Sequence, residues 1–312
     1  MADLLPVGVG FKDPLPDTPP DVLEGLLPEQ GQLLITGETN VGKSLLAIEV
    51  CSSLSTGTPL WGQIQPSKTL PNIKYILAEH FAGVIQRLFR KTGLQMHDNV
   101  RLIAPEHLGV GKQLVINGLP QKQTIDKLSK WCEGADFVVF DPLAAFVAGA
   151  AETENASVPM RTCLDMMGLI AGRSGAASLI LHHLGKPYVD KEGGEHHRKA
   201  YASRGSSGIE DAATNIFYLL RAEGSSSMFH LNKRKYKGDA PERHTLQRDP
   251  DTLTHTLCTG PRPTVDGKRQ AFKRKLLVLQ MDHPEVPFTK LVEILASAEG
   301  VGRSTAFTYI KE

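Results

Sequence analysis

The chain has 312 residues, 41% of them hydrophobic, which is enough for one large α/β domain and a small appendage. Its 35 basic and 34 acidic residues nearly cancel, so bulk charge indicates neither a nucleic-acid nor a membrane partner, and any basic surface has to be local. The sequence shows no membrane-length apolar run, no signal peptide and no C-x-x-C spacing among its four cysteines, which predicts a cytoplasmic protein without structural zinc or disulfides.

The N-terminal part of the sequence predicts an extended arm followed by a nucleotide-binding unit. Prolines at 6, 14, 16, 19 and 20 oppose packed structure, so residues 1–25 are assigned to the arm. The apolar run 32–36 then predicts a buried strand, and residues 45–50 predict a helix. Between them, residues 37–44 match G-x-x-x-x-G-K-[ST] at every fixed position, in the strand–loop–helix context that this phosphate-binding loop requires.

This loop predicts ATP and Mg²⁺ as cofactors. Its two glycines allow a tight backbone whose N–H groups point at phosphate oxygens, and the following helix adds its positive dipole end. The loop lysine is expected to reach the β- and γ-phosphates, and the loop serine to hold Mg²⁺. The predicted nucleotide-binding residues are Gly37, Glu38, Thr39, Asn40, Val41, Gly42, Lys43, Ser44 and Leu45.

Strands and helices alternate along the rest of the expected ATPase domain, residues 26–260. Residues 74–79, 137–141 and 177–182 predict buried strands, and residues 84–94, 122–133 and 157–172 predict helices. This alternation is typical of a parallel sheet with helices on both faces. Later strands at 216–220, 228–231, 244–248 and 253–257 suit an antiparallel edge.

Three polar residues are predicted at the ends of these strands, where ligands of parallel sheets bind. Asp141 is the expected metal carboxylate, although an Asp that only caps the next turn is the alternative. Many such ATPases place a catalytic Glu directly after this Asp, but Pro142 occupies that position, so Glu79 is the candidate base. His182 is the candidate γ-phosphate sensor, with His183 expected to point the opposite way.

The remaining sequence predicts a loop and a small helical domain. The polar stretch 185–199 is rich in glycine, lysine and arginine, and residues 259–268 form a predicted linker. Helices at 269–281, 287–298 and 303–310 are expected in a domain spanning 268–312, and the last two resemble a helix-turn-helix. The histidines at 182, 183, 196 and 197 lack a carboxylate or cysteine at ligand spacing, so a metal site there is rejected.

The order phosphate loop, Glu, Asp, His resembles RecA-like hexameric helicases. Residues 155–157 (Asn-Ala-Ser), 181–183 (Leu-His-His) and 202–207 (Ala-Ser-Arg-Gly-Ser-Ser) are similar to the RepA-type replicative helicases of broad-host-range plasmids, and the resemblance covers about residues 22–250. It implies a RecA-like fold and a homohexamer that hydrolyses ATP between subunits while moving single-stranded DNA through the ring. By this resemblance, Lys43 and Ser44 bind phosphate and Mg²⁺, Glu79 is the base, Asp141 is the metal carboxylate and His182 is the sensor.

The resemblance also implies DNA-gripping loops and a finger that acts on the neighbouring subunit's γ-phosphate. The stretch 185–199 occupies the pore-loop position, against the alternative of an unconstrained surface loop. The predicted DNA-binding residues are Lys186, Lys191, Arg198, Lys199 and Arg204, the last of which alternatively anchors the loop. Thr214 stands where the family carries its finger arginine, so Lys233, Arg234 and Lys235 are the candidate replacements, unless they form only a solvated basic strand end.

The leading hypothesis is therefore a hexameric DNA-dependent ATPase, a helicase or translocase in the replication of a plasmid or other mobile element. Single-stranded DNA, further copies of the chain, and a replication initiator or primase are its expected partners, and no membrane is involved. The alternative is an ATP-switched DNA-binding scaffold or regulator that assembles without unwinding. A small-molecule kinase is a weaker third hypothesis, because no second substrate motif is present.

Overall fold

A nine-stranded sheet forms the centre of the larger of the two units into which the chain divides, Met1–Cys258 and Thr259–Glu312. The structure, a computed structural model, describes residues 20–108, 112–149, 157–184, 188–189, 195–196, 208–209, 212–222, 225–236 and 240–258, together with parts of 272–310. The strands of the large sheet, in spatial order, are β16 (His255–Leu257), β15 (Arg243–Arg248), β14 (Met228–Lys235), β13 (Asn215–Arg221), β3 (Gln32–Gly37), β10 (Ala177–His183), β8 (Phe137–Asp141), β4 (Ile73–Leu77) and β5 (Arg101–Ile103).

The sheet is parallel from β13 through β3, β10, β8 and β4 to β5, and antiparallel from β13 outward through β14, β15 and β16. This arrangement confirms the predicted mostly parallel α/β sheet with an antiparallel edge. The order also places β10 between the phosphate-loop strand β3 and strand β8. The carboxyl ends of β3, β10, β8 and β4 therefore meet at one edge of the sheet.

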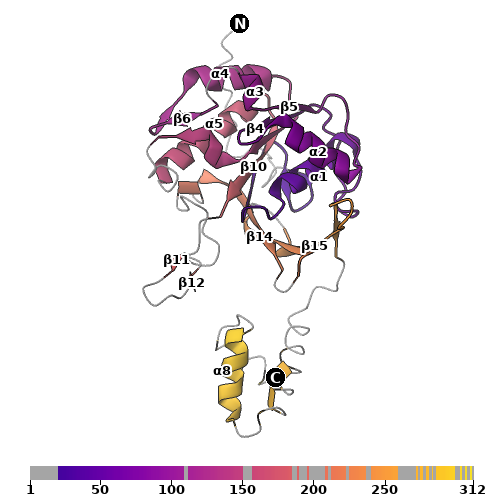
Figure 1. Cartoon of the computed structure of the whole chain (residues 1–312), viewed down its shortest axis with the longest axis vertical. Helices are drawn as coiled ribbons and strands as arrows, with labels where there is room; N and C mark the ends of the chain where they lie inside the picture. The colour runs from indigo at the N-terminus through magenta and orange to yellow at the C-terminus, as the bar shows by residue number, and fades with distance from the viewer. Residues whose placement is uncertain are drawn as a thin grey trace, which may run out of the picture. The chain divides into compact units, whose positions relative to one another are not determined.

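Helices cover both faces of this sheet because its strands are apolar on both sides (Figure 1). On β3, Leu33 and Ile35 belong to the core shared with α1 (Lys43–Thr56) and α2 (Ala82–Thr92). Leu34 points the other way, into the core shared with α4 (Lys122–Trp131) and α5 (Ser157–Gly172). The helices at 45–50, 84–94, 122–133 and 157–172 are thus confirmed, with ends shifted by a few residues.

Several short elements have too few residues to give a periodic sequence signal, and the sequence did not predict them. They are β1 (Asp21–Leu23) with β2 (Leu27–Pro28), the three-stranded sheet of β7 (Leu119–Pro120), β6 (Val115–Ile116) and β9 (Val147–Ala148), the helix α3 (Pro105–Leu108), the 3-10 helix η1 (Leu143–Phe146), and the pair β11 (Tyr188–Val189) and β12 (Glu195–His196).

The end of the expected N-terminal arm differs from prediction, because residues 21–25 pack into the core. Val22 and Leu23 in β1 are almost fully buried, with 1% and 0% of their surface exposed. Gly25 makes the return to β2 possible with a left-handed φ of 64°, and its N–H donates to Asp21 Oδ2 at 2.7 Å. Burial of two aliphatic side chains outweighs the extended tendency of the neighbouring prolines.

The smaller unit has its own apolar core around α8 (Phe288–Ala298). Leu291, Val292 and Leu295 of α8 are buried against Phe272 and Ala306, and Phe307 and Ile310 pack on the same cluster. Phe307 and Ile310 thus pack against the core of the smaller unit.

No helix among the described residues combines the length and apolar character that crossing a membrane requires. Cys51, Cys132 and Cys163 are buried free thiols, and Cys258 is an exposed one.

Candidate active site

The phosphate loop joins β3 to α1 in a conformation that depends on its glycines. A Cβ on Gly37 would lie 2.7 Å from the backbone oxygen of Leu219 and 2.9 Å from Val41 Cγ1, so a larger residue does not fit. Gly42 has a φ of 111°, in the left-handed region that disfavours side chains, and caps the first turn of α1. The loop therefore delivers its backbone N–H groups and the N-terminus of α1 to one place.

Lys43 crosses this loop from the first turn of α1. Its ammonium donates to the carbonyl oxygens of Gly37 at 2.9 Å and Glu38 at 2.8 Å, and lies 3.3 Å from His183 Nδ1. Burial lowers the pKa of Lys43 to about 8, and the negative charges of Asp141, Glu79 and Glu38 oppose that shift. An ammonium held by loop carbonyls is well placed to exchange them for phosphate oxygens.

The other loop residues differ in exposure. Glu38, Thr39 and Asn40 are exposed at the tip of the loop, whereas Val41 and Leu45 are buried beneath it. Because their side chains are buried, only the backbone of these two residues is available to a nucleotide.

Asp141 and Ser44 form an oxygen pair beside Lys43. Asp141 ends β8 and is 5% exposed; it accepts a hydrogen bond from Tyr75 Oη at 2.6 Å, and the Ser44 hydroxyl lies beside it. Burial raises the pKa of Asp141, while the hydrogen bonds from Tyr75 and Ser44 and the charge of Lys43 act against it.

A carboxylate and a hydroxyl side by side are hard oxygen ligands of the kind Mg²⁺ prefers. A nucleotide-bound Mg²⁺ is held largely by phosphate oxygens and water, so Asp141 and Ser44 would supply only part of its shell. The pair therefore fits the predicted metal site.

One face of the sheet gathers the polar groups of the site. Leu77, Val139 and Leu181 all point into the core beneath α1 and α2. Because strand side chains alternate with a period of two, Asp141 and His183 share that face, and Glu79 follows the same parity just beyond β4. All three therefore lie on the side of the sheet where α1 begins.

Glu79 lies in the loop two residues past β4, because the strand ends at Leu77 and not at the predicted residue 79. The backbone N–H of neighbouring Ala78 donates to the Asp141 carbonyl at 2.8 Å, which ties this loop to β8. The Glu79 side chain is 38% exposed, with Oε2 3.8 Å from His183 Nε2. The neighbouring His183 ring lowers the pKa of Glu79, against the effect of partial burial, which favours the ionised carboxylate that a base requires.

His183, and not the predicted His182, lies beside Lys43 and Glu79. This corrects the placement of His182 in the site. Strand β10 continues through His183, whose ring bridges Lys43 and Glu79. His182 has no exposed surface and faces the α5 side of the sheet, with the parity of Ile180. The sequence shows that adjacent histidines point oppositely, but only the packing of α1 reveals which one points into the site.

His183 thus controls the ionisation of Glu79, and this contact is testable. A charged Lys43 donates to Nδ1, which leaves Nε2 to carry the proton that faces Glu79. In His183→Phe that donor is gone, so the pKa of Glu79 should rise and the acid limb of the kcat/KM profile should move to higher pH. An unchanged acid limb in His183→Phe would contradict this role.

The predicted finger residues lie two strands away from the phosphate-loop strand β3 of their own chain. They occupy the C-terminal end of β14, which runs antiparallel to β13, and Lys233 pairs with Phe217, level with Ile35 of β3. Lys233 Nζ contacts Glu242 Oε1 at 2.7 Å and the Ala240 carbonyl at 2.9 Å. Lys233, Arg234 and Lys235 therefore lie at the end of β14 that runs toward the sheet edge opposite the loop.

The predicted DNA-binding residues Lys186, Lys191, Arg198, Lys199 and Arg204 lie outside the described residues, as do residues 155–156 and 202–207 of the family-like motifs. Within the predicted pore-loop stretch the structure describes only the antiparallel pair of β11 and β12, with Tyr188 opposite His196.

Sequence reasoning did not identify Tyr75, His183 or Arg248. Tyr75 precedes Glu79 by four residues, so the period of a strand puts it on the same face, a signal that was available in the sequence. Arg248 ends β15, and nothing in the sequence places that strand beside the phosphate loop. A Cβ on Gly42 would nevertheless lie 3.4 Å from Arg248 Nη1.

Two comparisons with known proteins show similarity to this chain. A structural relative is a KaiC-like protein from the hyperthermophilic archaeon Pyrococcus horikoshii, with 13% identity and a TM-score of 0.49 over 76% of this chain and 93% of that one. The family model of the AAA domain known as AAA_25 matches residues 2–188, which include the phosphate loop, Glu79, Asp141 and His183. The chain therefore belongs to the AAA_25 family of AAA domains, as a P-loop ATPase with a RecA-like fold.

Proposed function

We propose that this chain is a DNA-dependent ATPase that works as a hexameric RepA-like helicase or translocase on single-stranded DNA, in the replication of a plasmid or other mobile element. The observation that carries the proposal is the meeting of Glu79, Asp141, Ser44 and Lys43 at one sheet edge. A free ionised carboxylate beside a metal-binding pair suits attack by water and not transfer to a metabolite. This geometry favours a hydrolase over a kinase.

In the proposed reaction, Glu79 takes a proton from a water molecule whose oxygen attacks the γ-phosphorus. The bond between that phosphorus and the bridging oxygen of ADP breaks, and its electron pair leaves with ADP. Lys43 and the loop N–H groups stabilise the charge on the phosphate oxygens. When bound, Mg²⁺ would neutralise part of the same charge from Asp141 and Ser44.

DNA engagement and ring formation rest on the resemblance in residues 155–157, 181–183 and 202–207. Lys186, Lys191, Arg198, Lys199 and Arg204 would bind the backbone of single-stranded DNA from the ring interior. A finger in trans explains why Lys233, Arg234 and Lys235 lie away from their own loop. A replication initiator or primase would recruit the ring to its origin.

ATPase assays with and without single-stranded DNA test this function. We expect a slow basal rate that single-stranded DNA raises strongly, together with assembly into a ring when a non-hydrolysable ATP analogue is added. Lys186→Ala with Lys191→Ala should lose the stimulation and keep the basal rate. Equal rates with and without DNA would count against the helicase.

The second candidate is an ATP-switched DNA-binding scaffold or regulator. Thr214 at the family's finger position and a separate C-terminal unit with its own core favour it. On this hypothesis ATP drives assembly, and the C-terminal unit binds duplex DNA. A forked-DNA unwinding assay separates the two candidates, because only the helicase releases the displaced strand, and does so only with hydrolysable ATP.

A further inference from the structure

Arg248 lies on the outer side of the phosphate loop, at the last position of β15. Strand β15 is antiparallel to β14, which is antiparallel to β13, so β15 runs parallel to β3 and ends at the same edge of the sheet. The guanidinium is half-buried beside Gly42, where a Cβ would lie 3.4 Å from Nη1. A cation is therefore held against the loop on the side opposite to β10, β8 and β4.

A second arginine, Arg221, lies over the same aromatic ring as Arg248. Arg248 Cζ lies 4.3 Å from the centroid of the Phe229 ring, and Arg221 Cζ lies 5.6 Å from the same centroid. Neither guanidinium has an ion pair with a carboxylate among the described residues. Burial, and then the charge of Arg221, lower the pKa of Arg248. Two like charges on one aromatic ring repel each other, and a bound anion would relieve that repulsion.

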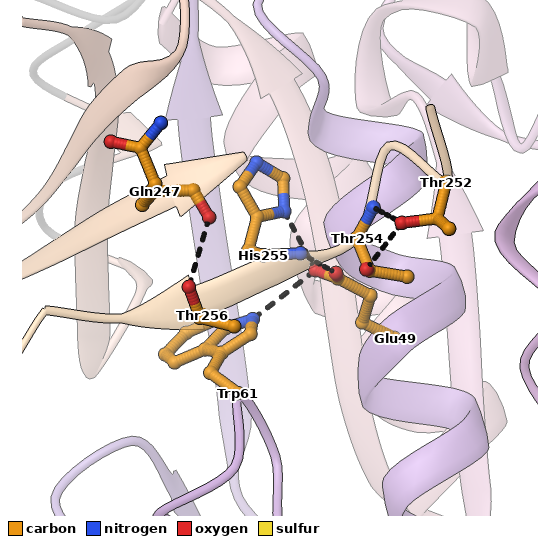
Figure 2. Close-up of polar contacts among 7 residues, drawn as sticks. All are labelled: Glu49, Trp61, Gln247, Thr252, Thr254, His255 and Thr256. Carbon is orange, nitrogen blue, oxygen red and sulfur yellow. Dashed lines mark hydrogen bonds and ion pairs between the residues drawn. The ribbon is translucent and has the colours of Figure 1, made fainter. Parts of the chain in front are cut away.

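The nearby carboxylate of Glu49 is engaged elsewhere, in a buried clamp between α1 and β16 (Figure 2). Glu49 Oε2 accepts from Trp61 Nε1 at 3.1 Å and lies 2.9 Å from His255 Nδ1, and Oε1 accepts the His255 backbone N–H. His255 is the ladder partner of Arg248, across the turn that Asp249 stabilises by accepting from Thr252. The clamp thus fixes the end of β15, and Arg248 with it, relative to the first turns of α1.

The position of Arg248 indicates which part of a ligand it meets. The groups assigned to the γ-phosphate, Glu79, Asp141 and His183, all lie on the β10–β8–β4 side of the loop. A triphosphate whose γ end is on that side extends its nucleoside end toward β13, β14 and β15. We propose that Arg248, with Arg221 behind it, binds the phosphate nearest the nucleoside in the nucleotide site of its own chain. This inference rests on the nucleotide binding of the proposed function, and it adds a cationic subsite that the loop motif does not contain.

Calorimetric titration of the full-length protein with Mg-ADP, Mg-ATPγS and magnesium tripolyphosphate tests the subsite. Arg248→Gln should weaken all three about ten- to a hundredfold, the loss of one charge-assisted hydrogen bond. Arg221→Gln should cause a smaller loss. Arg243→Gln is the matched control, because Arg243 starts the same strand, is exposed, and donates to Asn232 at 2.7 Å; it should bind as the unaltered protein does.

The outcomes separate this inference from the proposed function. If Lys43→Ala retains full nucleotide affinity, the phosphate loop is not the site and the proposed function fails. If Lys43→Ala loses affinity but Arg248→Gln does not, the subsite alone is overturned. A loss confined to the two nucleotides, with tripolyphosphate unaffected, overturns the phosphate contact in favour of the base. Arg248→Lys, which keeps the charge, should recover part of the affinity, and it should unfold at the same temperature as Arg248→Gln.

Discussion

Replacing Glu79 with glutamine should reduce ATP turnover by about 10²–10⁴-fold, the range for loss of a positioned general base. The amide keeps the size of the side chain and its place beside His183, but it cannot accept a proton from water. Affinity for Mg-ATP should stay close to that of the unaltered protein, because Lys43, Ser44 and Asp141 are intact. Single-turnover hydrolysis and nucleotide titration on the same preparation measure the two quantities separately.

A matched carboxylate provides the control. Glu106 accepts the Ala82 backbone N–H at 2.8 Å through Oε1, a contact that an amide oxygen also makes, and it touches none of the site residues. Glu106→Gln should therefore hydrolyse ATP at nearly the normal rate. Undiminished turnover in Glu79→Gln would remove the base from the mechanism, and the hydrolase geometry proposed for this site would fail with it.

Replacing Lys233, Arg234 and Lys235 together with alanine should lower turnover by about 10³–10⁵-fold if they supply the transition-state cation in trans. Nucleotide affinity should change little, since these residues lie at the end of β14 that runs away from the edge of the sheet where their own phosphate loop begins. Turnover is measured under conditions of full assembly, because a ring or filament is needed to bring one subunit's β14 to the next subunit's loop.

Mixing two inactive variants makes this prediction specific. In a mixed assembly of Glu79→Gln with the triple-alanine variant, some interfaces combine an intact Glu79 from one subunit with intact basic residues from its neighbour. Activity should therefore reappear on mixing, although each variant alone is inactive. If mixing recovers nothing while both variants co-assemble, the basic strand end is only a solvated or pairing surface, as the contact of Lys233 with Glu242 would then suggest.

The phosphate loop and the placement of Glu79 and Asp141 at one edge of the parallel sheet could be predicted from the sequence. Local rules are sufficient for these features. Glycines are required where φ is left-handed or the backbone is crowded, as at Gly42 and Gly37, and proline cannot act as a base. Apolar runs that end in a polar residue also place that residue at the sheet edge where ligands bind.

Three features depend on contacts between residues far apart in the chain, and only the tertiary structure decided them. The choice between His182 and His183 follows from which face of β10 is covered by α1, and strand periodicity alone does not contain that information. Residues 21–25 join the core because Val22 and Leu23 find an apolar surface to bury against. Arg248 reaches Gly42 only because the buried Glu49–His255 contact joins residues 206 positions apart, and long-range burial of this kind leaves no local pattern in the sequence.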